Sequence, residues 1–144
     1  MIAKGVVPLG FFGSSWPLDD RARAREVLAA MPKEEDLDLC EKLASYLRGA
    51  TMILAWMEYT TDLLDDNYGV SGGSAVMSDG TYFWRFDTAH YVEKHAIALD
   101  PDFVGHVRKA EFVPTPLDET ERVELEKTIL DAKANLRKLF YRGT

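Results

Sequence analysis

The sequence has little cysteine and no long apolar run, and each absence excludes a class of protein. The single cysteine, Cys40, excludes an internal disulfide framework and fits a reducing compartment such as the cytoplasm. No apolar run approaches the roughly 20 residues that a membrane-spanning helix needs. We therefore expect a cytoplasmic protein with no membrane contact.

The N-terminal segment also lacks the features of a secretory signal peptide. Its apolar part is broken by Pro8 and Gly10, and no small-residue cleavage site follows. We interpret residues 1–16 as an extended arm or an edge strand laid on the domain. A chain of 144 residues with 47% hydrophobic content is long enough to bury a core, so we predict one globular domain over residues 1–144.

Basic charge is scarce in the middle of the chain. The net charge is −7, and residues 33–102 hold 14 acidic and 5 basic side chains, a net charge of −9 that leaves +2 for the flanks. Nucleic-acid binding requires the opposite sign, so we predict no nucleic-acid partner. An acidic surface suits a basic protein partner, and it also serves solubility alone. The sequence leaves both interpretations open.

A predicted β-hairpin is the centre of the chain. Asp79 and Gly80 form a two-residue turn signal, in which Gly80 accepts the positive φ of a type I′ turn. Residues 74–77 before the turn suit a strand, and residues 81–86 after it alternate in the manner of a second strand. Three aromatic side chains of that strand should share one face: Tyr82, Trp84 and Phe86.

Apolar spacing and capping residues predict the rest of the fold. Helices are expected over residues 19–31 and 33–48, after Asp87 or Thr88, after Asp100-Pro101, and over residues 118–141. Residues 51–57 predict a third strand, with a short helix as the alternative, whereas residues 58–67 and 68–73 predict an acidic loop and a glycine-rich turn. The predicted fold class is therefore α+β: a small antiparallel sheet of three or four strands packed by about five helices. Its core aromatic residues should include Trp56, Trp84, Tyr91 and Phe103.

No catalytic or metal-binding motif stands out. Asp62, Asp65 and Asp66 offer oxygen ligands for a hard cation, but the spacing of a calcium loop is missing. His90 and His95 are five residues apart, so they do not share a helical face as a zinc-binding H-E-x-x-H pair does. We therefore predict no metal ion, no cofactor and no catalytic residue.

A series of short patterns over residues 44–108 resembles a group of small bacterial proteins. The patterns are Y-L-R-G at residues 46–49, S-D-G-x-x-x-W at residues 78–84, Y-V at residues 91–92 and L-x-x-x-F at residues 99–103. The group has Y-L-R-x-G, D-G-x-x-x-W, a Y-Y-V-like helix and L-P-x-x-F, from which this chain departs at Ala50 and at Asp100-Pro101. Some members sit near secreted-toxin genes, so the resemblance implies an immunity-type binding role.

The leading hypothesis is a non-enzymatic protein-binding protein, and the resemblance suggests an immunity protein that neutralises a basic bacterial toxin. An acidic inhibitor gains association rate from complementary charge. One alternative is a small hydrolase or another enzyme that uses Asp87, His90 and the loop of residues 62–66. The other is a structural or regulatory subunit that docks through the helix of residues 118–141. The oligomeric state is left open. The predicted partner contacts are Asp62, Asp65, Asp66, Asp87, His90 and Glu93.

Overall fold

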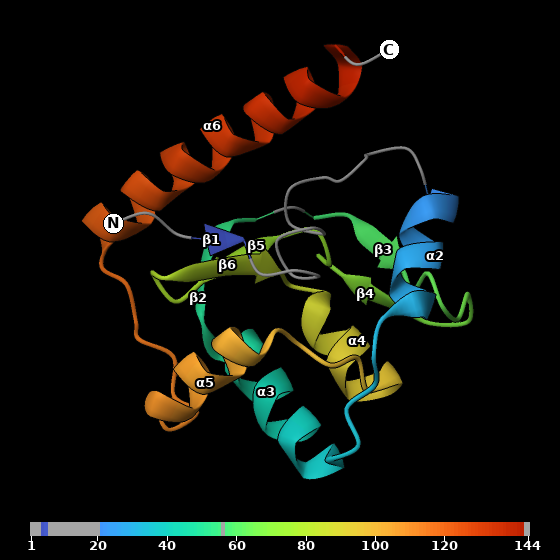
Figure 1. The fold of residues 1–144 in the computed structure, drawn as a ribbon. Coiled ribbons are helices and arrows are strands. Elements are labelled where there is room, and N and C mark those ends of the chain that lie inside the picture. The colour runs from blue at the N-terminus through green and yellow to red at the C-terminus, as the bar shows by residue number, and fades with distance from the viewer. Residues whose placement is uncertain (1–3, 6–20, 56, 143–144) are drawn as a thin grey trace.

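The computed structural model describes residues 4–5, 21–55 and 57–142, and over these ranges it confirms the α+β fold class (Figure 1). The helices in these ranges are α2 (Arg21–Ala30), α3 (Leu37–Gly49), α4 (Thr88–His95), α5 (Pro101–Lys109) and α6 (Glu119–Arg142). The strands are β1 (Lys4–Gly5), β2 (Thr51–Leu54), β3 (Tyr59–Thr61), β4 (Gly69–Ser71), β5 (Val76–Ser78) and β6 (Tyr82–Arg85). None of the helices described is both long and apolar enough to cross a membrane.

The larger sheet has the strand order β1-β6-β5-β2. Strands β5 and β6 form the predicted antiparallel hairpin, in which Met77 lies opposite Trp84. Strand β2 pairs antiparallel with β5, and β1 adds to β6 in parallel. The three antiparallel strands are those that the sequence predicted. Strand β1 lies in the N-terminal segment that was interpreted as an extended arm or an edge strand, and its parallel pairing with β6 was not foreseen.

The segment between β2 and β5 was predicted incorrectly. The expected loop of residues 58–67 and turn of residues 68–73 instead contain β3 and β4, which pair antiparallel as a separate two-stranded sheet with Thr60 opposite Val70. Each strand has three residues, which is too short for an alternating pattern to stand out. This β3–β4 hairpin is therefore inserted between two neighbouring strands of the larger sheet.

The turn between β5 and β6 confirms the positive φ at Gly80, which is 96°. A type I′ turn needs positive φ at both central residues, and neither neighbour of Gly80, Asp79 or Thr81, has positive φ. The turn is therefore not type I′. The side chain of Asp79 supports it instead, because its Oδ1 accepts the backbone N–H groups of Thr81 (2.9 Å) and Tyr82 (2.8 Å).

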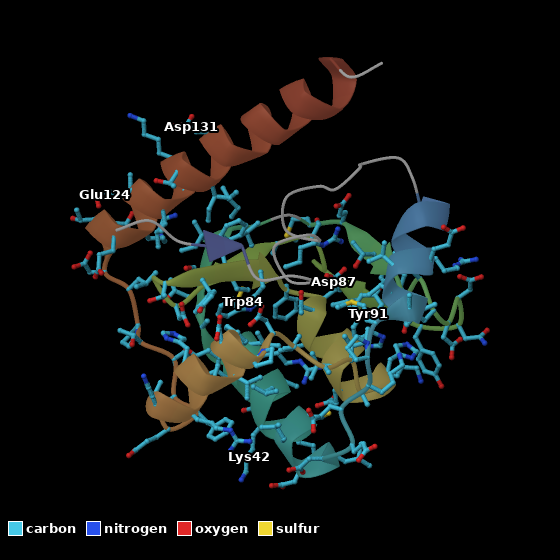
Figure 2. The ribbon with its side chains drawn as sticks, in the orientation of Figure 1. Lys42, Trp84, Asp87, Tyr91, Glu124 and Asp131 are labelled. Carbon is cyan, nitrogen blue, oxygen red and sulfur yellow. The ribbon has the colours of Figure 1, made fainter. Side chains whose placement is uncertain are left out.

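The alternation of β6 builds a core on each face of the sheet. Trp84 is buried among side chains of α3, α4 and α5, and its Nε1 donates to the carbonyl of Leu47 at 3.0 Å. Phe83 faces the other way and packs with Leu125 and Ile129 of α6. Helices α3, α4 and α5 thus lie on one side of the sheet and α6 on the other (Figure 1). Figure 2 shows Trp84 and Tyr91 in the interior, with acidic side chains of α6 pointing to solvent. Phe103 is buried with Trp84, and Trp56 lies outside the described residues.

Capping residues set the helix boundaries. Helix α3 begins four residues later than predicted, because Asp36 caps it by accepting the N–H of Leu39 at 3.1 Å. Asp100 caps α5 as expected. Asp118 and Glu121 form the predicted capping box of α6. The 24 residues of α6 span about 36 Å, and the second half of the helix projects past the sheet (Figure 1).

Candidate functional site

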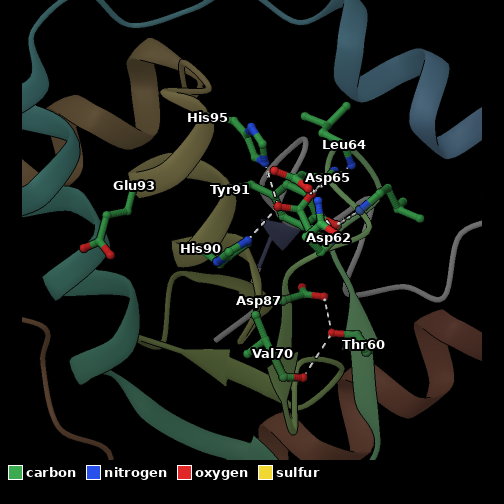
Figure 3. A network of polar contacts seen from close by, with 12 residues as sticks. Thr60, Asp62, Leu64, Asp65, Val70, Asp87, His90, Tyr91, Glu93 and His95 are labelled. Atoms are coloured by element: carbon green, nitrogen blue, oxygen red, sulfur yellow. Dashed lines mark hydrogen bonds and ion pairs between the residues drawn. The ribbon is translucent and has the colours of Figure 1, made fainter.

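Polar side chains gather where the β3–β4 hairpin meets α4 (Figure 3). Asp62 follows β3 and is 1% exposed. Its Oδ1 accepts the backbone N–H groups of Leu64 (2.8 Å) and Asp65 (3.2 Å), which shape the turn after the strand. Its Oδ2 points away from this turn and toward α4.

Two histidines of α4 converge on that second oxygen. The Nε2 atoms of His90 and His95 lie 2.7 Å and 2.6 Å from Asp62 Oδ2. The two residues are separated by about 140° around a helix, so they do not share one helical face. They nevertheless meet at one carboxylate oxygen, because Asp62 lies between the two rings. Helix α4 ends at His95, where Ala96 takes the left-handed conformation with φ 53°.

The charge of Asp62 is fixed by these contacts. Burial raises the pKa of Asp62. The hydrogen bonds from His95, His90 and the Leu64 N–H together lower it by more than burial raises it, so the pKa lies below its usual range. Asp62 is therefore a carboxylate that only accepts, and both histidines donate from Nε2. Together the three side chains form a clamp between hairpin and helix. We call this set, Asp62, His90 and His95, the His–Asp clamp.

A second buried carboxylate lies beside the clamp. Asp87 is 4% exposed, and its Oδ2 accepts from Thr60 Oγ1 (3.0 Å) and an Arg85 guanidinium nitrogen (2.9 Å). Its Oδ1 is buried without a hydrogen-bond partner among the described residues. Burial outweighs the attraction of Arg85 and raises the pKa of Asp87. Asp87 stands at the N-cap position of α4, but its side chain does not cap the helix as predicted.

The predicted partner contacts divide into buried and exposed residues. Asp62 and Asp87 are buried, so they cannot touch a partner, and that part of the prediction needs correction. Asp66 and Glu93 are exposed, but they form ion pairs with Arg25 (3.4 Å) and Arg48 (3.0 Å). Figure 3 shows Glu93 pointing away from the clamp. The structure therefore does not assemble these residues into one surface. The other two predicted contacts, Asp65 and His90, are half-buried.

The exposed apolar side chains of the β3–β4 hairpin were not foreseen from the sequence. Met57 is 95% exposed and Tyr59 is 65% exposed. The Tyr59 ring lies over Gly69, where a Cβ atom would collide with it. Tyr68 is also exposed, and the Lys94 Nζ lies 3.6 Å from its ring centroid. The two tyrosines bracket the acidic loop in the sequence, which was the available signal.

A second aspartate-centred cluster lies at the other end of the helical layer. Asp79 Oδ2 accepts from the Tyr46 hydroxyl (2.6 Å) and from His106 Nε2 (2.8 Å). Burial first, and then the bond to Asp79, raise the pKa of Tyr46, so its hydroxyl stays protonated. The sequence analysis assigned Asp79 only to a turn and did not foresee this cluster.

Comparisons with protein families, with curated proteins and with solved structures give no match, so the chemistry of the site rests on its own geometry.

Proposed function

We propose that this protein is a non-enzymatic binding protein that holds a basic protein through the exposed surface of the β3–β4 hairpin. This hairpin surface consists of Met57, Glu58, Tyr59 and Asp66. The observation that carries the proposal is the exposure of Met57 and Tyr59 next to acidic side chains. The resemblance noted in the sequence supports a bacterial toxin as the basic partner and neutralisation of that toxin as the role.

The chemistry of the hairpin surface suits a protein interface. Methionine and aromatic side chains are enriched in interfaces, and tyrosine is among the residues that carry most of the binding energy. Residues 57–72 carry four acidic side chains and no lysine, arginine or histidine. Negative charge around apolar anchors favours a basic partner and speeds the encounter.

The interior contacts hold the hairpin surface in a single geometry. The clamp fixes the end of β3 to α4, and Thr60 is hydrogen-bonded to Asp87. The Tyr91 hydroxyl adds a third link by accepting the Leu63 N–H at 3.0 Å. A surface ordered before binding loses less conformational entropy on association. The buried polar residues therefore hold the hairpin surface in place for binding and do not contact the partner themselves.

The same geometry argues against the hydrolase alternative. His90 is oriented by Asp62 and not by Asp87. Among the described residues, neither histidine of the clamp is hydrogen-bonded to a serine, threonine or cysteine that it would activate. Cys40 is buried, and burial raises the pKa of its thiol, which makes it a poor nucleophile.

The test compares the hairpin surface with a matched site on α6. The hairpin variant Glu58→Lys with Tyr59→Ala reverses one exposed charge and removes one exposed apolar side chain. The control variant Glu124→Lys with Leu130→Ala makes the same two changes on α6, where both residues are exposed. Wild type and variants, with folding checked by circular dichroism, are used to capture partners from lysate of the source organism. Association rates are then measured with the purified partner.

We expect the hairpin variant to lose capture and the control to retain it. Association of the wild type should slow between about 0.01 M and 0.1 M salt, as the Debye length falls from about 30 Å to about 10 Å. Loss of capture only in the α6 variant would assign the interface to α6 and support the subunit alternative. Equal capture by both variants, with no salt dependence, would refute the proposal.

A further inference from the structure

We propose that Asp62, His90 and His95 form a binding site for a divalent transition metal ion of the zinc type. The ligands are Asp62 Oδ2 and the Nε2 atoms of the two histidines. These atoms lie within 4.8 Å of one another, so one ion can reach all three. The inference does not depend on the proposed partner, because the clamp lies beneath the hairpin surface.

The distances from Asp62 Oδ2 to the two histidine nitrogens need only a small increase to admit the metal ion. Zinc binds histidine nitrogen at about 2.0–2.1 Å and carboxylate oxygen at about 2.0–2.2 Å, so neighbouring ligands of a tetrahedral site are about 3.3–3.5 Å apart. The hydrogen-bonded contacts from Asp62 to His90 and His95 are 2.7 Å and 2.6 Å. Each contact must therefore open by less than about 1 Å. Rotation of the side chains of His90 and His95 on α4 would supply such a movement without a change in the sheet.

The carboxylate is already oriented for an ion. Asp62 Oδ1 is held by the N–H groups of Leu64 and Asp65, which leaves Oδ2 for the metal. Partners of this kind orient a ligand and are part of the design of metal sites. The side chain of Asp62 is inaccessible, whereas those of His90 and His95 are each 17% exposed. The histidine side is therefore the entry route for the ion, and it leaves the fourth position to water.

The donor set selects the class of metal. Two imidazole nitrogens and one carboxylate oxygen suit zinc and its neighbours among the transition metals. Calcium and magnesium prefer sites made only of oxygen. The cluster of Asp79 offers one histidine and a tyrosine hydroxyl that stays protonated, so it lacks the second nitrogen. His106 is therefore a control histidine that also contacts a buried carboxylate.

Binding replaces the two hydrogen bonds with three coordinate bonds, one from Asp62 Oδ2 and one from each histidine Nε2. In the metal-free form both Nε2 atoms carry a proton that they donate to Asp62. An Nε2 atom bound to a metal carries no proton, so a neutral ring must keep its proton on Nδ1. The ion would still connect β3 to α4, and it would stabilise the folded state because the unfolded chain lacks the assembled site.

The experiment uses the full chain after treatment with a chelator. Zinc chloride is added during thermal melting, with calcium and magnesium chloride as comparison salts. At a free zinc concentration of 100 times the dissociation constant, the ratio of folded to unfolded protein should rise roughly a hundredfold. ¹⁵N NMR of the histidine rings should show the protons of His90 and His95 moving from Nε2 to Nδ1, while His106 is unchanged.

His95→Gln is the test variant and His106→Gln its matched control. Glutamine retains an N–H donor for Asp62, so the test variant should fold. We expect it to weaken zinc binding by more than about tenfold, the lower end of the effect of losing even an outer-shell partner, and we expect the control to bind as the wild type does. Three results would overturn the site. The first is a wild type that zinc does not stabilise, and the second is a His95→Gln variant that zinc stabilises as much as the wild type. The third is a His106→Gln variant that loses as much zinc affinity as His95→Gln. An equal effect of calcium would overturn the metal class.

Discussion

The two hairpins of this protein are each anchored by a buried aspartate, and the two anchors differ in what they connect. In both Asp62 and Asp79, Oδ1 accepts two backbone N–H groups of the following turn and Oδ2 accepts two side-chain donors. The donors are His90 and His95 at Asp62, and Tyr46 and His106 at Asp79. Both donors to Asp62 belong to α4, whereas those to Asp79 come from α3 and α5. The first anchor attaches one hairpin to one helix, and the second joins two helices and the larger sheet.

The difference shows that a buried aspartate with four hydrogen-bond donors can either stabilise the core or form part of a candidate binding site. At Asp79 the tyrosine packs against Trp84 and Phe103, with ring centroids 6.2 Å apart in each case. Loss of this anchor therefore disturbs the main core. At Asp62 both donors are imidazoles that reach the surface, so the anchor is confined to the hairpin and offers nitrogen ligands.

The largest effect is expected from Asp79→Ala. The substitution leaves the buried Tyr46 hydroxyl and the N–H groups of the turn without their acceptor. Each buried donor left without its acceptor costs about 1–3 kcal/mol, and several lose it together, so we expect a loss of about 3–5 kcal/mol by urea unfolding. Asp102→Ala, at an exposed acidic residue on α5, is the control and should change little. A loss below about 1 kcal/mol for Asp79→Ala would show that the anchor does not support the core.

Asp62→Asn should have a smaller and more local effect. The amide keeps one acceptor oxygen, so only part of the hydrogen bonding is lost, and we expect a loss of about 1–3 kcal/mol in the presence of a chelator. Hydrogen exchange should quicken at the backbone amides of β3 and β4. Amides of β5 and β6 should keep their protection. Uniform loss of protection across both hairpins would remove the distinction between the two anchors.

The glycines of the two hairpins provide a third comparison. Gly80→Ala places a side chain at φ 96°, and we expect a loss of about 1–2 kcal/mol. Gly69→Ala brings a Cβ atom against the Tyr59 ring, but this exposed ring can swing aside, so the loss should be smaller. Melting temperatures of the two variants test the order. A larger loss at Gly69 would show that the Tyr59 ring is fixed in place.

Asp87→Asn should stabilise the protein at neutral pH. Burial raises the pKa of Asp87 in the folded state above the unfolded value of about 3.9. The protonated acid therefore fits the fold, and stability is lost as the pH rises through the folded pKa and the side chain ionises. The neutral amide should therefore be more stable than the wild type at pH 7, and the gain should fade toward about pH 4, where the wild-type carboxyl is protonated too. Melting curves of both proteins at pH 7 and pH 4 measure it, and a variant less stable at pH 7 would show that the ion pair with Arg85 dominates.

The sequence predicted the parts of the fold whose signals are local. The alternation of β6, the positive φ at Gly80 and the capping box at Asp118 depend on neighbouring residues, and all three are confirmed. Strands β3 and β4 were missed because three residues give no period to read. An edge strand in the N-terminal segment was one of two interpretations, but its parallel pairing with β6 was missed because pairing between distant strands leaves no local pattern.

The candidate site was harder to predict because its members are far apart in the sequence. Asp62 lies 28 residues before His90 and 33 before His95, and only the hairpin brings them together. The spacing of His90 and His95 argued against a shared metal site, because helical spacing compares positions on one face of one helix. It does not detect a residue of another element, such as Asp62, that lies between two faces of the helix. Burial of Asp62 and Asp87 was equally hidden, because an acidic loop predicts solvent exposure.

The pairing of Leu54 with Val76 means that the chain leaves the larger sheet and returns to it at a single point, with the β3–β4 hairpin between. A segment attached in this way can change length cheaply, since each doubling of a loop costs about 0.6 kcal/mol in closure entropy. The order of the strands in the larger sheet does not depend on the length or sequence of the segment between β2 and β5. The length and sequence of the hairpin can therefore change while the framework that folds around Trp84 is retained.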